Sequence, residues 1–210
     1  MLEKNQIFIK NLRKMIKFYY GMSGTFKSTT IDSESKGFEN PTIIRSMIKP
    51  WKRIEENLFP GLIEKNNIIF ATLHLCNLES QVSNLDIDHL TLIERGVTDM
   101  LFYQSQECNS IVQNDSWIRK AVEYELGLVE NDANSNSPEK ILLIQKDRDF
   151  IENKILSEPT RREIFPDVDS YLKAQDDYVK FTGKYNKLTD IKIINDANVY
   201  LNSLNYDRQK

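Results

Sequence analysis

The sequence predicts an α/β fold, a three-layer α/β/α sandwich with a mainly parallel sheet. Short apolar segments bounded by turn residues alternate with longer segments of helical spacing. Four of the short segments are expected to be strands: Met15–Tyr20, His89–Ile93, Lys140–Gln145 and Asp190–Ile194. Their nearly continuous apolar character is typical of strands covered on both faces. In such folds ligands bind beyond the carboxyl ends of the strands, so the residues after each strand are the first place to look for function.

Helical periodicity covers most of the sequence between these strands. The predicted helices are approximately Pro41–Glu64, Ile68–Ser83, Val97–Gln113, Ser116–Leu128, Asp149–Leu156 and Ser170–Lys184. The chain of 210 residues, 40% of them hydrophobic, shows no repeat and no long linker. We therefore expect a single domain over residues 1–210.

Composition limits the function classes. The net charge is −3, with 28 basic and 31 acidic residues interspersed, so no global field indicates nucleic acid or an anionic membrane as a partner. No segment resembles a signal peptide or a membrane span, which predicts a soluble cytoplasmic protein. Abundant Asn, Lys, Ile and Asp suggest an AT-rich genome, such as that of a phage or a low-GC bacterium. Cys76 and Cys108 are not spaced as metal ligands and are expected to be buried thiols.

The segment after the first predicted strand, GMSGTFKST, has the outer spacing of a phosphate-binding loop, G-x-x-x-x-G-K-[ST]. In such loops backbone N–H groups surround the β-phosphate, the lysine neutralises phosphate oxygens and the hydroxyl binds Mg²⁺. Phe26 replaces the last glycine, and it fits only without positive φ or at the cost of a small strain. Lys27 is expected to be exposed. As a phosphate-binding loop, this segment is predicted to bind ATP through Gly21, Met22, Ser23, Gly24, Thr25, Phe26, Lys27, Ser28 and Thr29. The alternative is an ordinary turn between a strand and a helix.

An acid and a base, Glu94 and Arg95, follow the second predicted strand. Burying this pair at the end of an interior strand is costly unless both side chains have partners. A Mg²⁺ ion and a phosphate would supply those partners, with Ser28 and Glu94 on the metal side and Arg95 on an acceptor phosphate. The alternative is an ion pair at the surface.

Three segments together resemble the thymidylate kinase and deoxynucleoside kinase branch of the P-loop NTPases: GMSGTFKST, IIFATLHLCNLESQ (68–81) and LIERGVTDMLFYQ (92–104). Thymidylate kinases carry an Asp-Arg pair followed further on by Tyr-Gln, and here Glu94-Arg95 precedes Tyr103-Gln104. The Glu-Arg form itself is more similar to deoxynucleoside kinases. The resemblance implies acceptor-binding helices over about residues 41–83 and an acceptor site that includes Arg45, Phe70, His74, Arg95, Tyr103 and Gln104. For His74 the alternative is a histidine packed within a helix.

The resemblance also implies a helical lid over about residues 148–170, whose arginines close over the transferring phosphoryl group. Arg161 and Arg162 match that lid in position, and Arg148 is a further candidate. Paired arginines in a polar segment are otherwise solvated.

The kind of acceptor depends on the segment after Lys27. Only thirteen residues separate Lys27 from Pro41, which predicts too little chain for a normal helix and a full second strand. Deoxynucleoside kinases place a carboxylate at the end of that strand as general base; Glu34 and Glu39 are the nearest candidates. A monophosphate acceptor needs no base but extra cations, which Arg45 and the lysines and arginine after it could supply. This balance favours a nucleotide acceptor.

We therefore expect ATP-dependent and Mg²⁺-dependent phosphoryl transfer to a deoxynucleoside monophosphate, as in thymidylate kinases. The expected catalytic residues are Lys27, Glu94, Arg95, Arg161 and Arg162. The alternatives are a deoxynucleoside kinase, a polynucleotide 5′-hydroxyl kinase, which alone would have a nucleic-acid partner, and a non-catalytic nucleotide-binding module whose loop Phe26 has blocked. The resemblance also implies a homodimer.

Overall fold

A five-stranded, fully parallel sheet forms the centre of the molecule, in the order β2-β3-β1-β4-β5. The computed structural model describes residues 15–22, 24–45, 67–82, 90–107, 115–130, 138–186 and 190–206. The strands are β1 (Met15–Tyr20), β2 (Thr42–Ile44), β3 (Leu90–Glu94), β4 (Glu139–Leu143) and β5 (Ile191–Ile194). The register aligns Tyr19 of β1 with Glu94 of β3, so the carboxyl ends of these two strands lie side by side.

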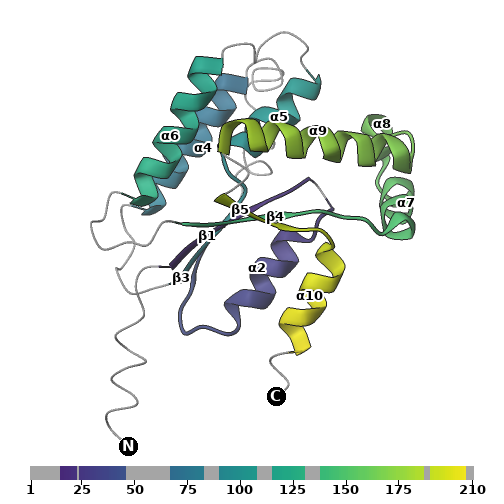
Figure 1. The fold of residues 1–210 in the computed structure, drawn as a ribbon, viewed down its shortest axis with the longest axis horizontal. Coiled ribbons are helices and arrows are strands. Elements are labelled where there is room, and N and C mark those ends of the chain that lie inside the picture. Colours follow the sequence, from purple (N-terminus) through teal and green to yellow (C-terminus); the bar gives the residue numbers. More distant parts are fainter. Residues whose placement is uncertain are drawn as a thin grey trace, which may run out of the picture.

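Helices cover both faces of the sheet, which makes the three layers (Figure 1). One face carries α4 (Asn67–Val82), α5 (Val97–Glu107), α6 (Asp115–Glu130) and α9 (Val168–Asn186), and the other carries α2 (Lys27–Ser35) and α10 (Ala197–Tyr206). Two shorter helices, α7 (Arg148–Ser157) and α8 (Pro159–Ile164), lie beyond the carboxyl end of β4, next to the first turns of α9.

Successive side chains of β1 point to opposite faces of the sheet and contribute to the core on both sides. Phe18 and Tyr20 pack in a cluster with residues of α9, whereas Tyr19 packs in a separate cluster with Ile31 of α2 and Ala197 of α10. All five side chains are fully buried. Successive strand residues point to opposite faces, so a strand that is apolar throughout must be covered on both sides.

The predicted α/β/α class and the four predicted strands are confirmed, but the segment after the phosphate-binding loop differs from the prediction. Residues Thr42–Ile44 form β2, inside the range predicted as a helix from Pro41. A helix and a second strand do fit after Lys27, because α2 has only nine residues and β2 only three. The β-branched run Thr-Ile-Ile favours a strand once β3 offers a parallel partner. The helices α2 and α10 were not predicted, and α8 lies within the range predicted as a helical lid.

Two expectations about surfaces have different outcomes. Cys76 is exposed on α4, so the prediction of a buried thiol is wrong there, while Cys108 lies outside the described residues. Within the described ranges, none of the helices combines the length and the apolar character that crossing a bilayer requires.

Candidate active site at the carboxyl edge of the sheet

The strand order places a crevice between the ends of β1 and β3. The chain leaves β1 toward α2 on one face and leaves β3 toward α5 on the opposite face. Connections that diverge in this way open a crevice at the carboxyl edge, where parallel sheets bind ligands. The loop that follows β1 and the turn Glu94–Gly96 border this crevice, and the backbone N–H of Arg95 donates to the carbonyl of Tyr19 across it, at 3.0 Å.

Backbone conformation shows why the loop needs glycine. Gly21 and Gly24 have φ of 145° and 94°, in the region that side chains rarely occupy. A Cβ on Gly21 would lie 2.5 Å from Oγ1 of Thr25 and 2.7 Å from the carbonyl oxygen of Leu143. The outer glycine of the predicted motif therefore has a steric reason. Ser23 lies outside the described residues.

Phe26 has a left-handed backbone, with φ 57° and ψ 21°, directly before α2. The structure thus adopts the second of the two alternatives, a strained residue at the position where the pattern has glycine. The Phe26 ring packs against Phe150 of α7 with 4.6 Å between ring centroids, and it is partly buried against the core cluster that contains Ile31 and Ala197. Packing contacts therefore hold the loop residue in its unfavourable conformation.

Lys27 is buried, with 4% of its surface exposed, so the expectation of an exposed lysine is wrong. Its ammonium group donates to the carbonyl oxygens of Gly21 and Met22, the latter at 2.7 Å. Burial, and next the charge of Arg95, lower the pKa of Lys27 to about 7. In this state the lysine closes its own loop, and a phosphate would replace the carbonyls as its partner.

Ser28 and Glu94 bring two oxygen donors together across the crevice. The Ser28 hydroxyl donates to Oε1 of Glu94 at 2.5 Å, and Oε2 of Glu94 lies 3.4 Å from Nη1 of Arg45. Mg²⁺ prefers such hard oxygen ligands and typically takes only one or two from the protein, with phosphates and waters supplying the others. The pair fits that ion, although no cluster of three acidic, histidine or cysteine side chains occurs in the part of the chain that is described.

Arg45 directly follows β2, which corrects its predicted place on a helix. It forms an ion pair with Asp32 of α2 and contacts the backbone carbonyl of Ser28 at 3.4 Å. The end of β2 therefore presents a cation to the crevice. The other predicted cations, at positions 49, 52 and 53, lie outside the described residues.

Arg95 follows β3 in a left-handed conformation, with φ 74°. Its charge acts on Lys27 and on the buried carboxylate of Asp99, which lies in the first turn of α5. Asp99 also accepts the backbone N–H of Gly96 at 3.1 Å. The turn after β3 thus holds its arginine close to the phosphate-binding loop and has a carboxylate as counter-charge.

The structure separates the three arginines of the predicted lid. Nη1 of Arg161 would lie 2.8 Å from a Cβ on Gly24, so this guanidinium covers the phosphate-binding loop, while Nη2 pairs with Glu158 at 2.8 Å. Arg162 is exposed. Arg148, also exposed, pairs with Asp169.

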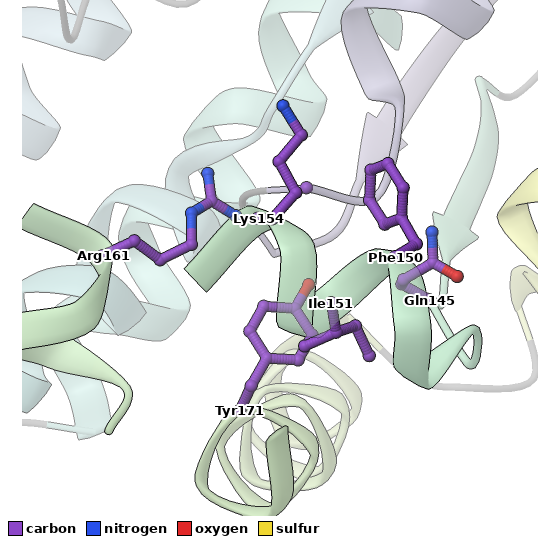
Figure 2. A pocket seen from close by; sticks show the side chains of 7 residues that line it. Gln145, Phe150, Ile151, Lys154, Arg161 and Tyr171 are labelled. Carbon is purple, nitrogen blue, oxygen red and sulfur yellow. The ribbon is translucent and has the colours of Figure 1, made fainter. Parts of the chain in front are cut away.

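A small hollow lies between Gly24 and the helices α7, α8 and α9 (Figure 2). Its walls include Gln145, Phe150, Ile151, Lys154, Arg161 and Tyr171. Figure 2 shows the charged ends of Lys154 and Arg161 reaching toward the same side of the hollow. The charge of Arg161 also lowers the pKa of Lys27, so the two cations lie close enough to interact.

The predicted base-recognition residues are only partly described. His74 is buried on α4, and its Nε2 lies 3.3 Å from Oε1 of Glu125 on α6. Glu125 also accepts the first backbone N–H of α5, from Val97, at 2.6 Å. The histidine is therefore tied into the helical packing. The side chains of Phe70, Tyr103 and Gln104 lie outside the described residues.

The two candidate general bases have clear placements. Glu34 is buried at the end of α2, where it accepts hydrogen bonds from Lys17, at 2.5 Å, and from Tyr19. These strand side chains use both of its oxygens on the face that α2 covers. Glu39 is exposed. Neither carboxylate lies at the end of β2.

Sequence reasoning missed Asp99 and Tyr178, which lie behind the two loops. Tyr178 of α9 accepts the backbone N–H of Gly21 at 3.0 Å. The sequence could have indicated Asp99, because it is an acidic residue in the first turn of the helix after Glu94-Arg95-Gly96, and carboxylates are favoured at helix N-termini. Nothing in the local sequence around Tyr178 indicates its contact with a loop 157 residues earlier.

Solved structures of nucleotide and nucleoside kinases are similar to this one. A thymidylate kinase from Candida albicans has a TM-score of 0.61 and 15% identity, over 94% of this chain and 92% of that chain. A thymidylate kinase from Ehrlichia chaffeensis has a TM-score of 0.55 and 12% identity, over 94% and 99%. A deoxyadenosine kinase from M. mycoides, with products dCMP and dCDP bound, has a TM-score of 0.54 and 14% identity, over 93% and 98%.

The chain has the P-loop fold of these kinases. It follows that the predicted fold resemblance is confirmed. No protein-family sequence model and no curated protein sequence matches the chain. At identities this low the likeness establishes the shared fold, and the activity has to be argued from the side chains at the crevice.

Proposed function

We propose that this protein is a kinase of deoxynucleotide metabolism that transfers the γ-phosphoryl group of ATP to a deoxynucleoside monophosphate, as a thymidylate kinase does. The similar solved structures include two thymidylate kinases, and we assign a donor side and an acceptor side to the crevice between β1 and β3. Each side is supported by its own set of contacts.

The observation that carries the proposal is the charge at the end of β2. A kinase that phosphorylates a sugar hydroxyl needs a base to take the proton of that hydroxyl. Here the residue after β2 is Arg45, and Glu34 is buried in contacts with Lys17 and Tyr19. An acceptor phosphate is already ionised near neutral pH, and it needs cations such as Arg45 and Arg95 rather than a base.

On the donor side, Lys27 would exchange its loop carbonyls for the β- and γ-phosphate oxygens of ATP, aided by the backbone N–H groups of the loop. Ser28 and Glu94 would hold Mg²⁺, directly or through its waters. When bound, that ion supplies charge neutralisation between the phosphates.

In the reaction, an oxygen of the acceptor phosphate forms a bond to the γ-phosphorus of ATP while the bond from that phosphorus to the β-γ bridging oxygen breaks. The products are a deoxynucleoside diphosphate and ADP. The equatorial oxygens carry the charge of the transition state. Arg161, which lies next to Gly24, and Lys27 would both stabilise that charge, and α8 would exclude water.

A deoxynucleoside kinase is the second candidate, because Asp32 places a carboxylate beside Arg45 and because a deoxyadenosine kinase is among the similar structures. In that case Asp32 would act as the base. The predicted cytoplasmic location and homodimer remain predictions.

The deciding measurement is ATP consumption by the purified protein with Mg²⁺ against the four deoxynucleoside monophosphates and the four deoxynucleosides. Turnover on a monophosphate, lost in Lys27→Ala and kept in Asp32→Asn, supports the proposal. Turnover on a deoxynucleoside that Asp32→Asn abolishes supports the second candidate instead. ATP binding without turnover on any acceptor points to a polynucleotide acceptor or to a non-catalytic module.

A further inference from the structure

A buried hydrogen-bonded chain links the phosphate-binding loop to the turn that carries Arg95. The backbone N–H of Gly21 donates to the Tyr178 hydroxyl at 3.0 Å, and the Tyr178 hydroxyl hydrogen-bonds with the Asp99 carboxylate. The same carboxylate accepts the backbone N–H of Gly96 at 3.1 Å. A hydroxyl can accept one hydrogen bond while it donates another, so the donors on both sides of the chain point toward the Asp99 carboxylate.

The two ends of this chain lie on opposite sides of the proposed reaction. Gly21 is the first residue of the donor loop, and its carbonyl oxygen accepts from Lys27. Gly96 follows Arg95, the proposed acceptor cation. Tyr178 and Asp99 come from α9 and α5, and both side chains are fully buried. They therefore sit behind both loops and do not face solvent.

Charge gives the link a role besides packing. Burial raises the pKa of Asp99, whereas the charges of Arg95 and Lys27 lower it, so the ionised carboxylate attracts both cations, and these two cations repel each other. A buried carboxylate between two cations offsets this repulsion and favours a defined position for each. Loss of the carboxylate would leave the cations without the charge that keeps them close together when no phosphate is bound.

We propose that Tyr178 and Asp99 are positioning residues that hold the donor loop and the arginine of the acceptor side in register, so that both substrates depend on them. This inference rests on the proposed kinase function for its acceptor half only. Both side chains are fully buried, so we assign them a positioning role, and α9 follows directly after the helix α8.

The test compares Tyr178→Phe, Asp99→Asn and the double variant with a matched control, Tyr185→Phe. Tyr185 is another tyrosine of α9, but it packs in the cluster of α4, α5 and α6 and away from the loop. We expect Tyr178→Phe to raise the Kd for MgATP, and the KM for ATP and for the acceptor, by at least about threefold, because the variant loses both the hydrogen bond from Gly21 and the one to Asp99. The control should leave all three within twofold.

The double variant distinguishes a linked pair from two separate structural residues. Because Asp99→Asn already breaks the chain, adding Tyr178→Phe should weaken substrate binding by less than the product of the single effects. Multiplying effects, or a lower melting temperature with an unchanged Kd and KM, would overturn the inference. Wild-type protein that binds MgATP but turns over no acceptor would overturn the proposed function alone, since the Kd for MgATP still tests the link.

Discussion

Replacing Phe26 offers a direct test of the unusual phosphate-binding loop. A residue other than glycine in the left-handed region costs about 1–2 kcal/mol. The half-buried ring returns about 1 kcal/mol through burial, and its packing on Phe150 adds about 0.5–1.5 kcal/mol. Phe26→Ala removes the ring but keeps the strain, so we expect it to lower the free energy of unfolding by about 2 kcal/mol.

Phe26→Gly removes the same ring and also the strain. It should therefore be more stable than Phe26→Ala by about 1 kcal/mol, or roughly 2–4 °C in Tm for a chain of this size. Elsewhere in a protein the order is usually reversed, because glycine loses more conformational entropy on folding than alanine.

The assay is urea unfolding of the two variants and the wild type, followed by tryptophan fluorescence, with MgATP affinity measured by calorimetry on the same samples. An alanine variant as stable as the glycine variant, or more stable, would refute the left-handed conformation of residue 26. Because the backbone already has the conformation of a glycine loop, MgATP affinity should stay within about threefold in Phe26→Gly. A much larger gain in affinity would mean that the ring obstructs the site.

Three further predictions address charged groups. Burial lowers the pKa of Lys27 to about 7, and bound phosphate favours its ammonium form. At pH 8 the binding of MgATP should therefore take up a proton, and the affinity should weaken as the pH rises further. Binding heats measured in buffers of different ionisation enthalpy report this proton uptake, which Lys27→Met should abolish. Glu34→Ala should lower the free energy of unfolding by about 3 kcal/mol without changing kcat, because it leaves Lys17 without its buried partner. The exposed control Glu39→Ala should change neither quantity, and a loss of kcat in Glu34→Ala would make Glu34 a candidate general base again. Arg161→Lys should lower kcat at least about a hundredfold and Arg162→Lys by less than twofold, and equal losses in a steady-state assay would contradict the different placement of the two side chains.

Much of the fold could be predicted because its signals are local. The strands β1, β3 and β4 are largely apolar on both faces and are bounded by turn residues, so their position and their burial follow from the sequence around them. The position of β5 was predicted as well, but not its burial, because Lys192 and Ile193 are exposed at the edge of the sheet. The strand β2 could not be found this way. Its three residues are too few for a periodic pattern, and what makes them a strand is the parallel partner that β3 provides from almost fifty residues later.

In the candidate site too, features set by neighbouring residues could be predicted, and features set by distant segments could not. The spacing of Gly21, Lys27 and Ser28, and the pair Glu94-Arg95 after a buried strand, were readable because a phosphate-binding loop and its partner residues are contiguous motifs. Which arginine covers the loop was not readable, since Arg161 and Arg162 are adjacent in sequence and only the direction in which α8 presents each one separates them.

By itself the sequence determined the α/β class and the positions of the loop after β1 and of the acid-base pair after β3, because the periodicity of strands and the residue types of a loop act over a few neighbouring positions. Tertiary structure alone decided that Phe26 is held left-handed by Phe150, that Lys27 is buried, that a cation follows β2, and that Tyr178 reaches Gly21. Each of these depends on two segments far apart in the chain meeting in space, and pairings of that kind are set by the packing of the whole core.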